Sequence, residues 1–190
     1  KSGVSGLVAA ALGIARQDRQ ALQTLNDLRF GVRVDHEGAL LRDFHTARPE
    51  KGTPYVTYRY YLADAEFVAG LESDDRALLV RIAQALQAPT FPLYLGRRSC
   101  PPVGRVFLKI SDEPLEAALR ADAPPGATRL VLDAAASEPG GLVRDVPLSF
   151  DPARREYTYR RVTERVLHGA AEHDPMAELE DAICLSLIHI

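Results

Sequence analysis

The order in which helical and strand patterns follow one another is the feature of this 190-residue sequence that most constrains its fold. Residues 2–16 place apolar side chains at helical spacing, and residues 28–35 alternate apolar and polar side chains as a strand does. A second strand or a hairpin is predicted over 55–71, a helix over 74–87 and a strand over 106–110. One strand ahead of the first helix would complete the βαββαβ order of the ferredoxin-like arrangement that RNA-recognition modules use. The sequence therefore predicts an α+β fold with a ferredoxin-like core.

The remaining patterns predict a β-rich C-terminal part. Residues 38–54 carry glycine, proline and charge and predict a long loop. After a short helix over 113–121, strands are predicted over 128–133, 142–150 and 157–167. The predicted organisation is a core over 1–110 that lacks its first strand, a β-rich part over 111–169, an acidic tail over 170–184 and a terminal segment over 185–190.

The net charge of −3 conceals an uneven distribution of charge along the chain. Residues 91–110 contain four basic side chains and no acidic one, and residues 154–165 contain five arginines against two glutamates. Residues 172–181 contain five acidic side chains and no basic one. The average charge argues against general binding of polyanions, but two basic patches can bind an anion locally.

Cysteine usage and hydropathy exclude several classes of protein. Cys100 and Cys184 have no CxxC partner, which excludes a zinc ribbon and a disulfide scaffold and fits a reducing, cytoplasmic compartment. No apolar run approaches the roughly 18 residues that a membrane span needs. His173 and Asp174 have no partner at metal-ligand spacing, so neither a metal nor a cofactor is expected.

Two segments in the first quarter of the chain carry side chains suited to phosphate. Lys1 and Ser2 open the first helix, whose N-terminal N–H groups can receive an anion; the alternative is a simple capped helix. Residues 41–46 (LRDFHT) combine Arg42, an aromatic ring, His45 and a hydroxyl, which suit phosphate and base contacts. The alternative there is a local pair between Arg42 and Asp43, with His45 as a satisfied polar residue.

Two further segments combine aromatic and basic side chains. In residues 57–62 (TYRYYL), strand alternation places Thr57, Arg59 and Tyr61 on one face and the other three side chains on the opposite face. Arginine and aromatic side chains on a strand can stack on single-stranded RNA, although the rings of one face could instead fill the core. Residues 92–102 (PLYLGRRSCPP) contain Arg97 and Arg98 with no acid nearby, and they are the strongest candidate anion site.

Taken in order, these four segments resemble one family, the CasD subunits of type I-E CRISPR Cascade in the RAMP superfamily. The matching blocks are Lys1-Ser-Gly with the small-residue helix after it, residues 41–46, the pattern Thr57-x-Arg59-x-Tyr61-Leu62, and residues 94–101 (YLGRRSCP). The resemblance implies a non-catalytic subunit that caps the Cascade backbone and holds the repeat-derived 5′ handle of the CRISPR RNA. It also implies contacts with the CasC backbone subunit and the CasA large subunit, and with target DNA only through the assembled complex.

The resemblance also assigns candidate residues and describes both ends of the chain. Carried over by position, the implied handle contacts are Lys1, Ser2, Arg42, His45, Tyr94, Arg97, Arg98 and Ser99, to which the strand pattern adds Arg59. The family's first strand has no counterpart here, so we expect an N-terminally truncated chain. Residues 185–190 (LSLIHI) are what a transposon mosaic-end adapter encodes in frame, and we expect them to be non-native read-through.

Two other functions are open at this point. One is a metal-independent endoribonuclease that processes CRISPR RNA, which a related branch of the same superfamily does. Cleavage would need a general base and a general acid, and His45 with Tyr58 or Lys109 is the plausible set. The other is a ferredoxin-like interaction domain that binds no RNA. We favour binding over cleavage because the histidines are scattered and no lysine adjoins one.

Overall fold

The computed structural model describes residues 1–167 and 186–189. Its helices are α1 (Ser2–Leu12), α2 (Arg19–Asn26), α3 (Arg76–Gln87) and α4 (Leu115–Ala121). Its strands are β1 (Arg29–His36), β2 (Ala39–Ala47), β3 (Tyr55–Ala63), β4 (Ala65–Glu72), β5 (Arg129–Asp133), β6 (Gly141–Ser149), β7 (Glu156–Val166) and β8 (Ser186–His189). One sheet has the order β6-β7-β5-β1-β4-β8, and a second sheet consists of β2 and β3. The predicted α+β class is confirmed.

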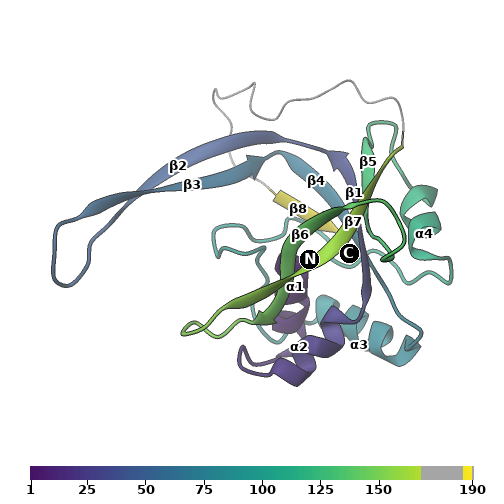
Figure 1. The fold of residues 1–190 in the computed structure, drawn as a ribbon, viewed down its shortest axis with the longest axis horizontal. Coiled ribbons are helices and arrows are strands. Elements are labelled where there is room, and N and C mark those ends of the chain that lie inside the picture. Colours follow the sequence, from purple (N-terminus) through teal and green to yellow (C-terminus); the bar gives the residue numbers. More distant parts are fainter. Residues whose placement is uncertain (168–185, 190) are drawn as a thin grey trace.

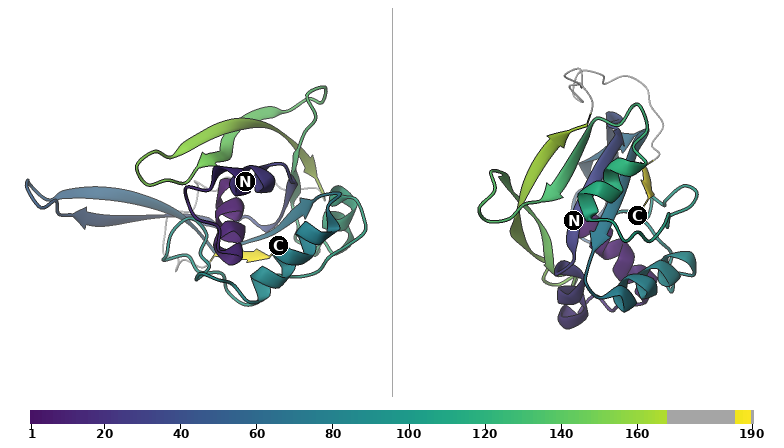
Figure 2. Two further views of the ribbon diagram at one scale, coloured as in Figure 1. Left: turned by 90° about the horizontal axis from the view of Figure 1, so that it is seen from below. Right: turned by 90° about the vertical axis from the view of Figure 1, so that its right-hand side faces the viewer.

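The hydrophobic core lies where α1 and α3 pack beside each other against the main sheet (Figure 1, Figure 2). Leu7 and Val8 of α1 are each 1% exposed, and Phe30 of β1 is 2% exposed. Ile82 and Leu86 of α3 complete this cluster. Each such side chain contributes about 1.5–3 kcal/mol when it leaves water. A smaller cluster holds α4 against β5 through Leu115, Leu119, Leu130 and Leu132.

A two-stranded arm projects from the main sheet (Figure 1). β1 leads into β2 and β3 into β4, so the antiparallel pair β1–β4 extends outward as the pair β2–β3. Both connections, β1 to β2 and β3 to β4, bend at the junction, where Gly38 has φ 72° and Asp64 has φ 55°. A Cβ atom on Gly38 would lie 2.3 Å from the carbonyl oxygen of Ala63, so only glycine fits there. His36 Nδ1 lies 2.6 Å from the carbonyl oxygen of Asp64 and forms a hydrogen bond across this bend.

Most of the predicted elements are confirmed, with local signals at their ends. α1 ends where Gly13 adopts the left-handed conformation and its N–H donates back to the last turn. α3 begins after Asp75, whose side chain accepts a hydrogen bond from the Leu78 N–H at 3.0 Å. The strands predicted over 28–35, 128–133, 142–150 and 157–167 are β1, β5, β6 and β7. The stretch 55–71 is β3 followed by β4, two strands in different sheets.

Two predictions are wrong, and one helix was not predicted. Residues 38–54 are not a long loop, because they contain β2. The side chains of β2 are exposed or half-exposed on both faces, so the strand lacks the apolar alternation that marks a half-buried one. Residues 106–110 are irregular chain, in which Val106 and Phe107 pack against the core without pairing in a sheet. The short helix α2, which buries Leu22 and Leu25, was missed.

The main sheet joins strands from both sides of residue 110, because β5 pairs with β1. β8 lies parallel to the first half of β4, with Ser186 opposite Ala65 and His189 opposite Val68. The predicted acidic tail falls outside the described residues, and the division into parts and the read-through origin of 185–190 stay predictions. Within residues 1–167 and 186–189, no helix has the length and hydrophobicity needed to cross a bilayer.

Candidate nucleic-acid interface

An open groove at the base of the arm brings β3 together with the loop that follows α3. The side chains that line it are Thr57, Tyr58, Arg59, Arg97, Arg98 and Ser99. Four residues predicted to contact RNA therefore meet here from two distant parts of the sequence. We call this the arm-base groove.

Tyr61 lies at the centre of these side chains. The Arg97 guanidinium donates a hydrogen bond to the Tyr61 hydroxyl at 3.3 Å, and its Cζ lies 5.1 Å from the centre of the Tyr61 ring. Hydrogen bonds from Ser99 first, and then from Arg97 and Arg59, lower the pKa of Tyr61 from its ordinary value. Hydrogen-bond donors and cations that stabilise the anionic phenolate in this way also attract other anions.

The loop that carries Arg97 is a closed turn. The Leu95 N–H donates to the Cys100 carbonyl at 2.9 Å, and the Cys100 N–H donates to the Arg97 carbonyl at 2.9 Å. Gly96 has φ 72°, which a residue with a side chain rarely adopts. The glycine in the predicted anion motif is thus explained by backbone geometry, and the turn directs the side chains that follow it.

The arginines of the arm-base groove differ from several others of the described chain in their ion pairing. In the part of the chain that the structure describes, Arg59, Arg97 and Arg98 form no ion pair with a carboxylate. In the second basic patch, by contrast, Arg154 pairs with Glu156 at 2.6 Å and Arg165 with Glu116 at 3.5 Å. The two patches look alike in sequence, but the arm-base groove keeps more of its positive charge for a ligand.

Arg160 of the second patch belongs to the framework of the protein. Its guanidinium donates to both carboxylate oxygens of Asp145, at 2.7 and 2.9 Å, and to Asp133 at 2.8 Å. The Arg160 side chain is 12% exposed and its Cζ lies 5.2 Å from the centre of the Phe30 ring. Burial acts to raise the pKa of Asp145, but the hydrogen bonds from Arg160 outweigh it and lower that pKa. This network ties β5, β6 and β7 together.

The start of α1 lies close to the loop of the groove, but its two candidate residues, Lys1 and Ser2, have different surroundings. A Cβ atom on Gly3 would lie 2.9 Å from Leu95 Cδ1, so the helix approaches that loop closely. The Lys1 side chain is only 5% exposed, and its Nζ donates to the carbonyl oxygens of Asn26 and Leu28 at 2.8 and 2.7 Å. No side-chain cap is present at this helix start. Ser2 is half-buried, whereas the Lys1 ammonium group is hydrogen-bonded inside the protein.

The arm places the remaining candidates on opposite faces of one ribbon. His45 pairs across the ribbon with Thr57, and its Nε2 lies 2.8 Å from Asp43 Oδ2, so the alternative pair between Arg42 and Asp43 is not formed. Arg42 instead stacks over Tyr58, with 5.3 Å from Cζ to the ring centre. Since Tyr58 lies one residue from Thr57 on the strand, it faces away from His45. The acid–base set proposed for cleavage is therefore not assembled between His45 and Tyr58, and Lys109 pairs with Asp122 elsewhere.

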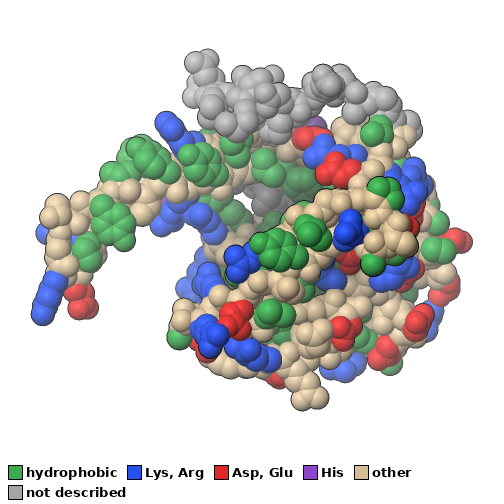
Figure 3. All heavy atoms as spheres, in the orientation of Figure 1, with side chains coloured by type: hydrophobic (Ala, Val, Ile, Leu, Met, Phe, Trp, Pro, Cys, Tyr) green, Lys and Arg blue, Asp and Glu red, His purple; other side chains and the backbone are tan. Residues whose placement is uncertain are grey.

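The face of the arm that carries Tyr58 is apolar and open to solvent. Hydrophobic side chains follow the arm in Figure 3. The exposed ones include Phe44 (67%), Val56 (51%), Tyr58 (61%) and Tyr60 (56%). The alternation predicted for residues 57–62 is confirmed, but neither face of this ribbon fills the core.

The chain is similar to known proteins in sequence and in structure. The sequence matches the family described as "CRISPR-associated protein (Cas_Cas5)" over residues 1–163. The chain belongs to the Cas5 family. The resemblance to CasD subunits of type I-E Cascade, found from the sequence motifs, is thereby confirmed.

Relatives of this Cas5 chain include proteins of known structure. It is 36% identical over 127 residues to the CRISPR system Cascade subunit CasD of Escherichia coli (strain K12), a match that spans 57% of each chain. A crystal structure of a Cas protein superposes with a TM-score of 0.65 at 38% identity, covering 87% of this chain and 79% of the other. A chain of a CRISPR RNA-guided surveillance complex superposes with a TM-score of 0.67 at 30% identity, covering 87% and 77%.

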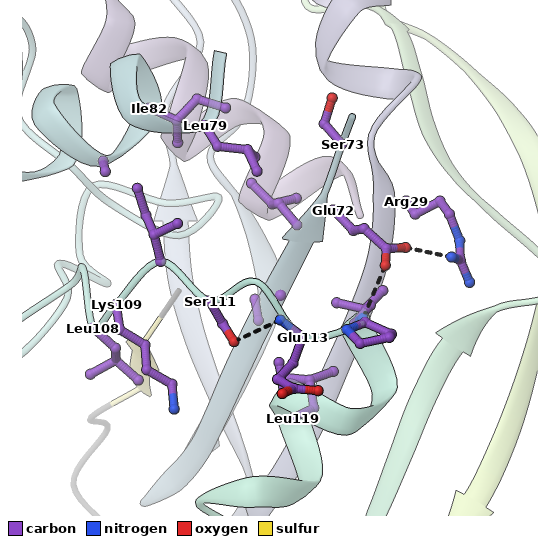
Figure 4. A pocket seen from close by; sticks show the side chains of 18 of the residues that line it. Arg29, Glu72, Ser73, Leu79, Ile82, Leu108, Lys109, Ser111, Glu113 and Leu119 are labelled. Carbon is purple, nitrogen blue, oxygen red and sulfur yellow. Dashed lines mark hydrogen bonds and ion pairs between the residues drawn. The ribbon is translucent and has the colours of Figure 1, made fainter. Parts of the chain in front are cut away.

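A larger cavity of this Cas5 chain, about 870 Å³, lies along the half of β4 that β8 leaves uncovered (Figure 4). Leu79, Ile82 and Leu119 line it, and Arg29 at its edge is bound to Glu72. Its other basic side chains are also paired, as Arg33 with Asp35, Arg76 with Asp112 and Lys109 with Asp122. An apolar cavity with neutralised charges does not suit a polyanion. Within the described ranges, no cluster of side chains could hold a metal ion.

Sequence reasoning missed one central residue and left another apart from the groove. Tyr61 was not proposed as a site residue, although its place two residues after Arg59 on the same face was a usable signal. Tyr94 does not line the arm-base groove, and its hydroxyl accepts a hydrogen bond from Arg16 at 3.5 Å. The structure thus brings Arg59, Tyr61 and the Gly-Arg-Arg loop together and leaves Lys1 and His45 outside this group.

Proposed function

We propose that this Cas5-family protein is a non-catalytic Cascade subunit that binds the repeat-derived 5′ handle of the CRISPR RNA in the arm-base groove. The observation that carries the proposal is the convergence at an open surface of Arg59, Arg97 and Arg98, which have no acidic partner among residues 1–167 and 186–189. An arginine guanidinium binds phosphate oxygens with two parallel hydrogen bonds. Ser99 adds a hydroxyl that suits either a phosphate or a ribose.

The same site fits single-stranded RNA better than a rigid duplex. Single-stranded binders combine a basic groove with aromatic side chains on which bases stack. Here the exposed ring of Tyr58 lines the basic groove together with the arginines. An extended strand can pass the arginines and place a base against a ring, which supports an unpaired handle as the ligand. His45 and Ser2 remain proposed contacts at the margin of this path.

Three finer statements belong to the proposal. We propose the CasC backbone subunit and the CasA large subunit as protein partners, for which the apolar face of the arm offers a contact surface. We also propose that α1, β1, β4 and α3 are the counterparts of a ferredoxin-like core. The position beside β4 that β8 partly fills is then the place of that core's first strand. A cytoplasmic location is part of the same proposal.

The test is a binding titration of the full chain with an RNA oligonucleotide that carries a type I-E repeat-derived 5′ handle, over a series of salt concentrations. Arg97→Ala with Arg98→Ala should weaken binding by about 100-fold or more, because it removes at least two charge-assisted hydrogen bonds of about 1.5–3 kcal/mol each. The salt slope should fall by about 0.7 for each phosphate of the single strand that the variant no longer neutralises.

The matched control is Arg154→Ala with Arg155→Ala, which removes the same charge from the other basic patch. We expect that control to change the affinity by less than about threefold, since exposed charges beyond the Debye length are screened. Equal effects in the two double variants, or an unchanged salt slope in the first, would contradict the proposal. The second of these results would show that Arg97 and Arg98 do not contact the RNA phosphates, and it would favour an interaction domain without a specific RNA site in this groove.

The same samples test the catalytic alternative without metal. A denaturing gel of repeat RNA incubated with the protein should show intact RNA. Specific cleavage that His45→Ala abolishes would establish endoribonuclease activity and overturn the non-catalytic assignment. The opposite orientation of His45 and Tyr58 on the arm leads us to expect none.

A further inference from the structure

Tyr61 connects the two halves of the arm-base groove. It lies on β3, whereas Arg97 and Ser99 lie on the loop after α3. The Arg97 guanidinium contacts both parts of the phenol, as a donor to the hydroxyl at 3.3 Å and as a cation 5.1 Å from the ring centre. Ser99 and Arg59 approach the same hydroxyl.

We propose that Tyr61 is a positioning residue that holds the Arg97 guanidinium toward the groove and leaves its charge free for a phosphate. The proposal rests on the RNA-binding function proposed above. A free arginine side chain samples many rotamers, so fixing it beforehand reduces what binding must order. The closed turn of residues 95–100 fixes the backbone of Arg97, and Tyr61 fixes the other end of the side chain.

A phenol suits this role better than a carboxylate would. Arg160 shows the other solution in the same protein, because its partners Asp145 and Asp133 neutralise it and turn it into part of the framework. Tyr61 is a neutral acceptor, and Arg97 has five N–H donors, of which the hydrogen bond to Tyr61 uses one. The remaining donors and the full positive charge stay available to the ligand.

The neighbouring tyrosine provides a matched comparison. Tyr60 is 56% exposed and lies on the opposite face of the ribbon, where it pairs with Arg42 across the strands. Its ring has no contact with Arg97 in the described structure. A substitution at Tyr60 therefore removes a similar ring from the same strand without touching the proposed device.

The experiment is a double-mutant cycle on affinity for the handle RNA oligonucleotide, with the full chain. Tyr61→Ala should weaken binding about 10-fold, because it removes a hydrogen bond and a cation–π interaction, and Tyr61→Phe about threefold, since the ring remains. In an Arg97→Ala background both substitutions at Tyr61 should have less than about a twofold effect, whereas any effect of Tyr60→Ala should persist there.

The outcomes separate this proposal from the function on which it rests. If Arg97→Ala weakens binding but the effect of Tyr61→Ala is the same in both backgrounds, Tyr61 does not position Arg97 and the proposal is overturned. If Tyr61→Phe weakens RNA binding as much as Tyr61→Ala does, the ring of Tyr61 has no role, and the proposed contribution of its cation–π interaction is wrong. If Arg97→Ala leaves binding unchanged, the proposed function itself fails, and the positioning role with it.

Discussion

Removal of the Arg160 side chain should lower the stability of the protein markedly. Three hydrogen bonds of 2.7–2.9 Å join its guanidinium to Asp145 and Asp133. Arg160→Ala leaves two carboxylates, each about one-fifth exposed, without their main partner. Breaking a buried pair from one side costs about 3–5 kcal/mol, and the partial exposure of these carboxylates reduces our expectation to about 2–4 kcal/mol.

Chemical denaturation followed by circular dichroism measures this decrease in stability, and thermal unfolding should show it as a fall in Tm of about 5–12 °C. Arg161→Ala is the control, because among the described residues the Arg161 side chain makes one hydrogen bond, to the Gly140 carbonyl. It should cost less than about 0.5 kcal/mol. A decrease in Arg160→Ala no larger than in Arg161→Ala would refute this reasoning.

Three further predictions concern the arm, the core and acid. Gly38→Ala should destabilise by at least about 1–2 kcal/mol, since alanine is strained at φ 72° and its Cβ meets backbone; Gly141→Ala, with open space around it, should change the unfolding free energy far less. Leu130→Ala, at a site with 0% exposure, should cost about 2–5 kcal/mol in a denaturation titration, against less than about 0.5 kcal/mol for Leu142→Ala at 65% exposure. Because the pKa of Asp145 is lowered in the folded protein, its carboxylate contributes to the free energy of unfolding above the unfolded pKa of about 3.9, and this contribution is lost as pH falls through the folded pKa. Asp145→Asn should therefore flatten the acid side of the profile of stability against pH. An unchanged profile would contradict this.

Sequence patterns predicted the helices and strands that bury one face, and they did not predict a strand that has no buried face. α1, α3 and β1 carry an apolar face, and their patterns predicted them to within a few residues. β2 has no buried face, since it pairs with β3 alone on an arm outside the core, so its sequence looks like a loop. The strand predicted over residues 106–110 was wrong for the opposite reason. Apolar side chains of this segment pack against the core, but its backbone pairs with no strand of the described structure.

The residue types of the candidate site could be predicted from the sequence, but not which of its basic side chains have acidic partners. Arg97 and Arg160 both stand in basic stretches, and sequence alone gave no means to separate them. Only the fold shows that two aspartates neutralise Arg160 and that a tyrosine holds Arg97. Lys1 illustrates the same limit, since its place at a helix start suggested phosphate, whereas its Nζ is bound to carbonyl oxygens inside the protein.

The most direct test of the central claim is ultraviolet crosslinking of the protein to handle RNA, followed by mass spectrometry of the crosslinked peptides. The account predicts adducts on peptides from β3 that contain Tyr58 or Tyr61 and on the loop that carries Arg97, Arg98 and Ser99. Competition with unlabelled handle RNA should remove these adducts, and Arg97→Ala with Arg98→Ala should reduce them. Specific adducts confined to residues 154–165, with none on β3 or the Gly-Arg-Arg loop, would show that the RNA lies on the other basic patch and would contradict the account.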